Sequence, residues 1–157
     1  MKLELFVQTA VLALSTTFAV AAFAQAPTPA KVKIKPAVKA AIPVKAKVVF
    51  QVSDGDAAKW NLALNNAANV QQELGADKVD IEIVAYGPGI GMLKADAVTS
   101  NRILDATKSG IQVVACENTM TAQKLTKADM NSAISYVPAG VVELMKRQTE
   151  GWAYIRP

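Results

Sequence analysis

The stretch GIQVVACENTMTAQKL, residues 110–125, carries the main structural signal of this chain. Its apolar, β-branched run at 111–116 is typical of a buried strand. Asn118 or Thr119 can then cap a short helix, because their side-chain oxygens accept hydrogen bonds from free backbone N–H groups. A buried strand that passes directly into a helix is typical of a parallel sheet, in which helices connect the strands.

The same alternation of strand and helix continues on both sides of this stretch. Further strands are predicted at 47–52, 79–86, 134–137 and 152–157. Helices are predicted over 57–74, from about Lys94 to Ser109, and over AGVVELMKRQTEG with Pro138 in the first turn. We therefore predict an α/β fold of three layers, with a mainly parallel five-stranded sheet and helices on both faces.

The chain divides into three segments by composition. Residues 1–24 are predicted to be a cleaved export signal, because a moderately apolar run ends in the small-x-small sequence Ala22-Phe23-Ala24. A membrane anchor is the alternative, but polar residues interrupt the run. Residues 25–46, rich in Lys, Pro, Ala and Val, are predicted to be a disordered linker. The α/β domain is assigned to 47–157, and the signal implies a periplasmic location.

The net charge of +4 arises in the linker, which contains lysines and no acidic residue. Over 47–157 the acidic and basic side chains nearly balance, so a nucleic-acid partner is not expected. The linker is interpreted as a spacer. A weak contact with an anionic membrane or wall surface is the sharper alternative.

The chain has no histidine and a single cysteine, Cys116. These counts exclude Ser-His-Asp and Cys-His catalysis, histidine-ligated metals and an internal disulfide. The segment GPGIGM at 87–92 matches neither the phosphate-loop pattern nor GxGxxG, and it is interpreted as a tight turn. Neither a metal site nor a bound cofactor is predicted.

Candidate site residues follow the predicted strands, since ligands of such sheets gather beyond the carboxyl ends of the strands. Cys116 is the candidate reactive group, because a thiol at a helix N-terminus is favoured as thiolate. The neighbouring Glu117 opposes this effect by its negative charge. The alternative is an inert, buried thiol. The expected pocket residues lie in three loops: Asp54, Gly55, Tyr86, Gly87, Pro88, Gly89, Asn118 and Thr119.

Four segments together resemble the DsrE/DsrF-like family, in its small exported branch. They are DGDAAKWNLALNNAANV, IEIVAYGPGIGML, GIQVVACENTM and YVPAGVVELMKRQTEGWAYIRP. The resemblance covers 47–157 and implies a five-stranded α/β sheet and close-packed homotrimers or homohexamers. It also implies a sulfur-relay role, in which the cysteine at the position of Cys116 carries a persulfide and residues 86–89 shape its pocket.

The function expected from these observations is that of a periplasmic, homo-oligomeric persulfide carrier, closer to a carrier than to a conventional enzyme. A sulfur donor protein and a sulfur acceptor protein are the expected partners. The rival hypothesis is a non-catalytic ligand-binding or scaffold oligomer with an inert Cys116. A third is a redox sensor that forms an intermolecular disulfide, which also fits an odd cysteine in an exported chain.

Overall fold

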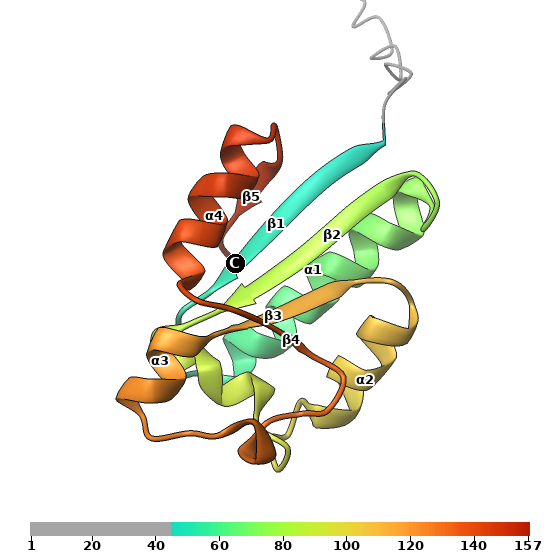
Figure 1. The fold of residues 1–157 in the computed structure, drawn as a ribbon. Helices are drawn as coiled ribbons and strands as arrows, with labels where there is room; N and C mark the ends of the chain where they lie inside the picture. Colours follow the sequence, from blue (N-terminus) through green and yellow to red (C-terminus); the bar gives the residue numbers. More distant parts are fainter. Residues whose placement is uncertain (1–44) are drawn as a thin grey trace, which may run out of the picture. The chain divides into compact units, whose positions relative to one another are not determined.

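The computed structural model describes residues 45–157, which form an alternation of strands and helices (Figure 1). The predicted signal at 1–24 and nearly all of the predicted linker at 25–46 lie outside the described residues. The elements are β1 Ala46–Val52, α1 Ala57–Leu74, β2 Val79–Ala85, η1 Gly87–Leu93, α2 Ser100–Lys108, β3 Gln112–Cys116, α3 Glu117–Ala122, η2 Lys127–Asp129, β4 Ser135–Val137, α4 Gly140–Thr149 and β5 Ala153–Ile155.

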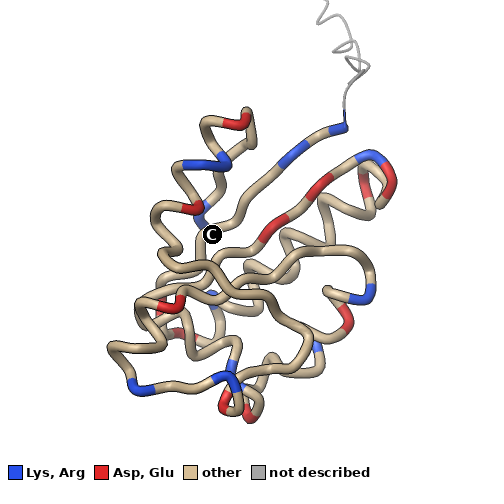
Figure 2. Tube along the Cα trace, in the orientation of Figure 1, with Lys and Arg blue, Asp and Glu red and all other residues tan. Residues whose placement is uncertain are grey.

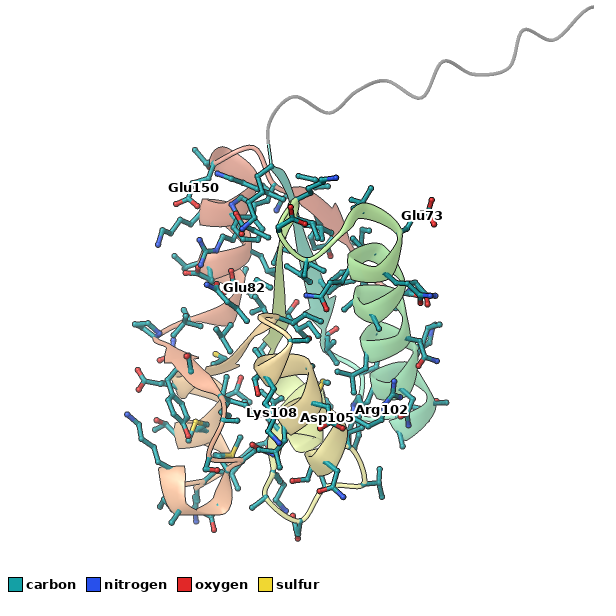
Figure 3. All side chains as sticks on the ribbon, turned by 90° about the vertical axis from the view of Figure 1, so that its right-hand side faces the viewer. Glu73, Glu82, Arg102, Asp105, Lys108 and Glu150 are labelled. Atoms are coloured by element: carbon teal, nitrogen blue, oxygen red, sulfur yellow. The ribbon has the colours of Figure 1, made fainter. Side chains whose placement is uncertain are left out.

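The five strands form one sheet in the order β4-β3-β2-β1-β5. All four pairings between neighbouring strands are parallel, so the predicted fold class is confirmed. Figure 3 shows the sheet edge-on, with α1 and α2 on one side and α4 on the other. The change of side follows from the topology. Successive strands advance in one direction up to β4, whereas the β4–α4–β5 connection returns past β1 with the same handedness.

Each face of the sheet has its own apolar core, because side chains alternate between the two faces along every strand. The face under α1 and α2 contains the larger cluster, which includes Phe50, Ile83 and Ile103. The face under α4 contains a smaller cluster of Val49, Val84, Val114, Leu144 and Trp152. Helix α4 therefore covers the second face, and its position determines which residues lie over the ends of the strands on that face.

The predicted helix from about Lys94 to Ser109 is wrong in its first half. Residues 95–99 form turns instead, and α2 begins only at Ser100. The tight turn predicted at 87–92 takes the form of the 3₁₀ helix η1. Tertiary packing explains the difference. An added Cβ on Gly89 would lie 2.3 Å from the carbonyl oxygen of Val52, so the glycine lets this segment pack directly against the end of β1. The Thr99 hydroxyl then donates to the Met92 carbonyl at 2.7 Å and fixes the turn.

Two predicted helix starts also need correction. Helix α3 begins at Glu117 with Cys116 as its N-cap, so neither Asn118 nor Thr119 caps it. Helix α4 begins at Gly140, two residues after Pro138. The Pro138 carbonyl accepts a hydrogen bond from the Asn118 N–H at 3.1 Å, which holds the two loops together. Asp56, one of two predicted caps for α1, does accept from the Ala58 N–H at 2.9 Å.

Positively and negatively charged residues are interspersed along the described part of the chain (Figure 2). Several of them form ion pairs at the surface, such as Lys45 with Asp80 at 2.6 Å. Among residues 45–157, no helix combines the length and the apolar character needed to cross a membrane.

Candidate functional site

Cys116 occupies the junction between a strand and two helices. It is the last residue of β3, it is the N-cap of α3, and its side chain belongs to the sheet face that α4 covers. Ala115 pairs with Ala85 of the neighbouring strand β2. Tyr86, the residue after Ala85, therefore lies beside Cys116. The thiol is the free sulfhydryl of a residue that is only 5% exposed.

Gly140, the first residue of α4, lies directly over this junction. A Cβ added to Gly140 would lie 3.3 Å from the Cys116 Cβ and 3.2 Å from the Tyr86 Cβ. Such contacts are tighter than normal packing, so the absence of a side chain lets the N-terminus of α4 approach the thiol. The first backbone N–H groups of a helix have no partner inside the helix, and they favour negative charge nearby.

Thr119 connects the thiol to the loop that follows β2. Its Oγ1 accepts a hydrogen bond from the Gly87 N–H at 3.0 Å, and Gln123 donates to the Gly87 carbonyl at 3.1 Å. A hydroxyl that accepts one hydrogen bond can still donate its own hydrogen. The Thr119 hydroxyl is the polar side chain that lowers the pKa of the Cys116 thiol.

The pKa of the Cys116 thiol lies below its ordinary value. Burial raises this pKa, but several hydrogen bonds to the sulfur together outweigh burial. The groups that lower this pKa are the Thr119 hydroxyl and the backbone N–H groups of Gly140, Thr119 and Asn118, the last of which also donates to the Pro138 carbonyl. The thiol itself lies 4.0 Å from that carbonyl and donates to it. Polar groups from α3, from α4 and from one side chain thus favour the thiolate of Cys116.

Glu117 was expected to oppose thiolate formation, and its charge is partly balanced in the structure. Its carboxylate lies 3.8 Å from the Lys127 ammonium. That ammonium in turn lies 4.6 Å from the centre of the Tyr136 ring. The side chain of Glu117 is 44% exposed, so water also screens its charge from the sulfur.

Comparison with known proteins assigns this arrangement to a family. The model of the DsrE/DsrF-like family matches residues 46–157. The chain belongs to the DsrE/DsrF-like family. No protein with a curated description matches it.

Three solved structures resemble this DsrE/DsrF-like chain. A protein of unknown function, MTH1491 from Methanobacterium thermoautotrophicum, is 36% identical, with 71% of this chain and 99% of that chain covered and a TM-score of 0.68. A conserved protein of unknown function, BT1422 from Bacteroides thetaiotaomicron, is 16% identical, with coverages of 71% and 94% and a TM-score of 0.59. The ychN protein from E. coli is 10% identical, with coverages of 73% and 99% and a TM-score of 0.59. The last two show the fold alone.

The structure divides the predicted pocket residues of this DsrE/DsrF-like protein into two groups. Tyr86, Asn118 and Thr119 lie at Cys116, and Gly87 is connected to it through Thr119. The remaining residues build the neighbouring loop at the end of β1. Gly55 lies against Pro88, where an added Cβ would be 3.3 Å from the proline Cβ, and Gly89 lies against the end of β1 as described above.

Asp54 also belongs to this second group. Its carbonyl accepts a hydrogen bond from the Trp60 indole at 2.6 Å, and its carboxylate lies 3.4 Å from the Arg156 guanidinium. Both contacts tie the β1 loop to α1 and to the C-terminus. The structure thus gives Asp54 a loop-fixing role.

Sequence reasoning missed Gly140, which packs against Cys116 and helps to lower the pKa of its thiol. A glycine at the start of a predicted helix was the available signal, because glycine is a poor helix former. Its place over Cys116 depends on α4 crossing to the opposite face of the sheet, which no local pattern indicates. Among residues 45–157, no group of three or more Cys, Asp or Glu side chains could hold a metal ion.

A separate groove of about 300 Å³ lies between α1 and α2, on the opposite side of the sheet from Cys116. Arg102 and Asp105, which Figure 3 labels, are among its lining residues. The Arg102 guanidinium is held by the Asn65 side chain at 2.7 Å. This groove shares no residue with the Cys116 site.

Proposed function

We propose that this DsrE/DsrF-like protein is an exported, homo-oligomeric sulfur carrier in which Cys116 holds sulfur as a persulfide. Family membership supports a sulfur-relay role. The observation that carries the proposal is the place of Cys116 at the N-terminus of α3, with the first residue of α4, Gly140, packed against it, and polar groups there lower its pKa. A thiolate is the nucleophilic form of cysteine, and it is the form that thiol exchange requires.

The proposed step is a transfer between thiols. The Cys116 thiolate attacks the outer sulfur of a donor persulfide, R–S–SH. The new bond joins the Cys116 sulfur to this sulfane sulfur, while the donor S–S bond breaks and its electron pair leaves with the donor as R–S⁻. The product is a persulfide on Cys116. The reverse step, with the thiolate of an acceptor as nucleophile, returns Cys116 to its thiolate.

The hydrogen-bond donors around the sulfur would serve both directions of this exchange. They stabilise the attacking thiolate when sulfur is taken up, and they stabilise the same thiolate as leaving group when sulfur is passed on. No general base is needed, because the lowered pKa of Cys116 supplies the reactive form. This matches a carrier that works between a donor protein and an acceptor protein.

The export and assembly parts of the proposal rest on other features. The sequence of residues 1–24 supports export to the periplasm, where the cytosolic partners of relay proteins would be absent. Exposed apolar side chains on α4, namely Val141, Val142 and Met145, support association into a homotrimer or homohexamer.

The proposal is tested by loading the purified protein with a small polysulfide and measuring its intact mass. We expect a gain of one sulfur atom per chain, and no gain in the Cys116→Ser variant, because that variant lacks the acceptor. A wild-type protein that stays at its original mass over a range of polysulfide concentrations would contradict the proposal.

A scaffold or ligand-binding oligomer is the alternative function, and the burial of Cys116 favours it. A residue that is 5% exposed is screened from large reagents. Alkylation of the native protein separates the two functions. A carrier reacts with iodoacetamide in the folded state at pH values below the ordinary thiol pKa of about 8.5. An inert core thiol reacts only at the rate of unfolding.

A further inference from the structure

A buried charge cluster joins β2 to α4, the helix whose first residue packs against Cys116. Glu82 is in the middle of β2, is 0% exposed and forms an ion pair with Arg147 of α4. The Arg147 Nε also lies 2.9 Å from Glu143, and its Nη1 lies 3.2 Å from Glu150. Figure 3 shows Glu82 between the sheet and α4. An ion pair in such a place fixes two elements against each other, since separating the charges would leave Glu82 buried and unpaired.

The register between α4 and β2 connects this ion pair with the site. Gly140, Leu144 and Arg147 follow the i, i+4, i+7 spacing of one helix face, and this face packs on the sheet. Beneath them, β2 and the residue after it present Tyr86, Val84 and Glu82 on one face of the sheet, because alternate residues share a face. The helix therefore runs antiparallel to β2, with Gly140 over Cys116 at one end and Arg147 over Glu82 at the other.

We propose that the Glu82–Arg147 ion pair is a positioning device that holds the first turn of α4 against the Cys116 sulfur. The ion pair restrains the position of α4 along the axis of the helix. The contact in the middle of this helix face is made by Leu144, which is apolar and gives little restraint in that direction. A shift of α4 by one residue would move its N-terminus about 1.5 Å, which is enough to carry the Gly140 N–H away from the sulfur. Arg147 and Glu82 are thus positioning residues that act through α4.

This inference rests on the proposed function, since it explains how the fold maintains a reactive Cys116. It also explains why a fully buried carboxylate lies in a central strand. Replacing a buried ion pair by apolar side chains of similar size is often neutral or stabilising, so stability is a weak reason for this pair. Apolar side chains in place of the ion pair would not restore the position of α4 relative to β2.

The test uses the double variant Glu82→Leu, Arg147→Met, which removes both charges while keeping apolar volume. The measurement is the rate of Cys116 alkylation by iodoacetamide as a function of pH, which gives the pKa of the thiol. We expect this pKa to rise by about one unit in the folded double variant. This equals about a tenfold fall in the thiolate fraction at pH values below the pKa.

Two further variants control for charge and for folding. Lys146→Met removes an exposed positive charge from the adjacent position of α4 and is expected to leave the profile unchanged. Arg147→Lys keeps the charge but loses the planar guanidinium, and it is expected to raise the thiol pKa in the same direction. Arg147 contacts Glu82 across the interface and contacts Glu143 and Glu150 within and at the end of α4, so Arg147→Lys tests the geometry of the pair without removing its charge.

Three outcomes are distinguishable. A higher thiol pKa in both Arg147 variants, with an unchanged Lys146→Met profile, supports the positioning device. Identical profiles in wild type and in a folded Arg147→Lys or double variant overturn it. If these variants shift the thiol pKa but wild-type protein takes up no sulfur from a polysulfide, the positioning holds and the proposed carrier function fails.

Discussion

Thr119 is the residue that makes the environment of Cys116 specific. A strand followed by a helix is common in α/β folds, but here the Thr119 hydroxyl accepts a hydrogen bond from the Gly87 N–H and lowers the pKa of Cys116. The hydroxyl therefore ties loop geometry to thiol chemistry. A change in this one group alters both the position of the Gly87 loop and the stability of the thiolate.

Replacing Thr119 by valine removes this hydroxyl while keeping the branched shape of the side chain. We expect the pKa of Cys116 to rise by about one unit, because a hydrogen bond to a charged group contributes about 1.5 to 3 kcal/mol. The pH dependence of iodoacetamide alkylation measures the shift. Thr119→Ser is the matched control, and it should retain the wild-type profile. Equal profiles for all three proteins would show that the hydroxyl does not act on the sulfur.

A substitution at Gly140 can test the contribution of α4 to the pKa of Cys116. In Gly140→Ala, the new methyl meets Cys116 and Tyr86 and moves the first turn of α4 away from the thiol. The overpacking costs about 1–3 kcal/mol, while the better helix propensity of alanine returns about 1 kcal/mol. We expect a net loss of at most about 2 kcal/mol in denaturant unfolding, together with a raised thiol pKa.

Val141→Ala is the control for this substitution, because Val141 is the next residue of α4 and is 53% exposed. Its alkylation profile should match that of wild type. If Gly140→Ala also retains the wild-type thiol pKa, α4 does not contribute to the stability of the thiolate.

At the scale of elements, the contact between α4 and β2 buries the carboxyl of Glu82, which costs free energy, and in our proposal it also holds α4 in position. Burial raises the pKa of Glu82 above its ordinary value of 4.5, against the opposing effect of Arg147. The folded protein thus binds the Glu82 proton more tightly than the unfolded chain does. The resulting contribution to stability is fully present below pH 4.5 and is lost as the pH rises through the raised pKa.

Glu82→Gln removes this titration and keeps a polar group beside Arg147. We expect the variant to gain stability relative to wild type as the pH rises from about 4 to about 8, because only wild type must ionise a buried carboxyl. Denaturant unfolding across this range measures the difference in unfolding free energy. A variant that is less stable at neutral pH, with a difference that closes in acid, would mean that the ion pair stabilises the fold.

The elements also show how far the sequence predicts this structure. Strands β1, β2 and β3 were predicted because their β-branched runs are buried on both faces. The tight turn at 87–92 was predicted from its glycines, but its 3₁₀ form and the turns at 95–99 were not, since they depend on contacts between distant parts of the chain such as Gly89 against Val52. Cys116, Tyr86 and Thr119 were found because parallel strands end at one edge. Gly140 was missed because its position depends on the crossing of α4.

At the scale of the whole molecule, the exposed apolar side chains of α4 predict association. Val142, which lies in α4, is 61% exposed. Val142→Lys places a charge in the proposed interface, so we expect a lower molar mass in sedimentation analysis. Val98→Lys is the matched control, because Val98 is 78% exposed in the turn before α2. An equal effect of both substitutions, or no effect of Val142→Lys, would place the interface elsewhere.

Passage of sulfur through Cys116 is the claim on which the proposed function depends. The decisive measurement is the intact mass of the protein after loading with polysulfide, and again after removal of the polysulfide and addition of a thiol acceptor. We predict a gain of one sulfur atom per chain, its loss to the acceptor, and neither change in Cys116→Ser. A mass that never changes, or a sulfur that is bound equally by Cys116→Ser, would contradict a carrier role for this thiol.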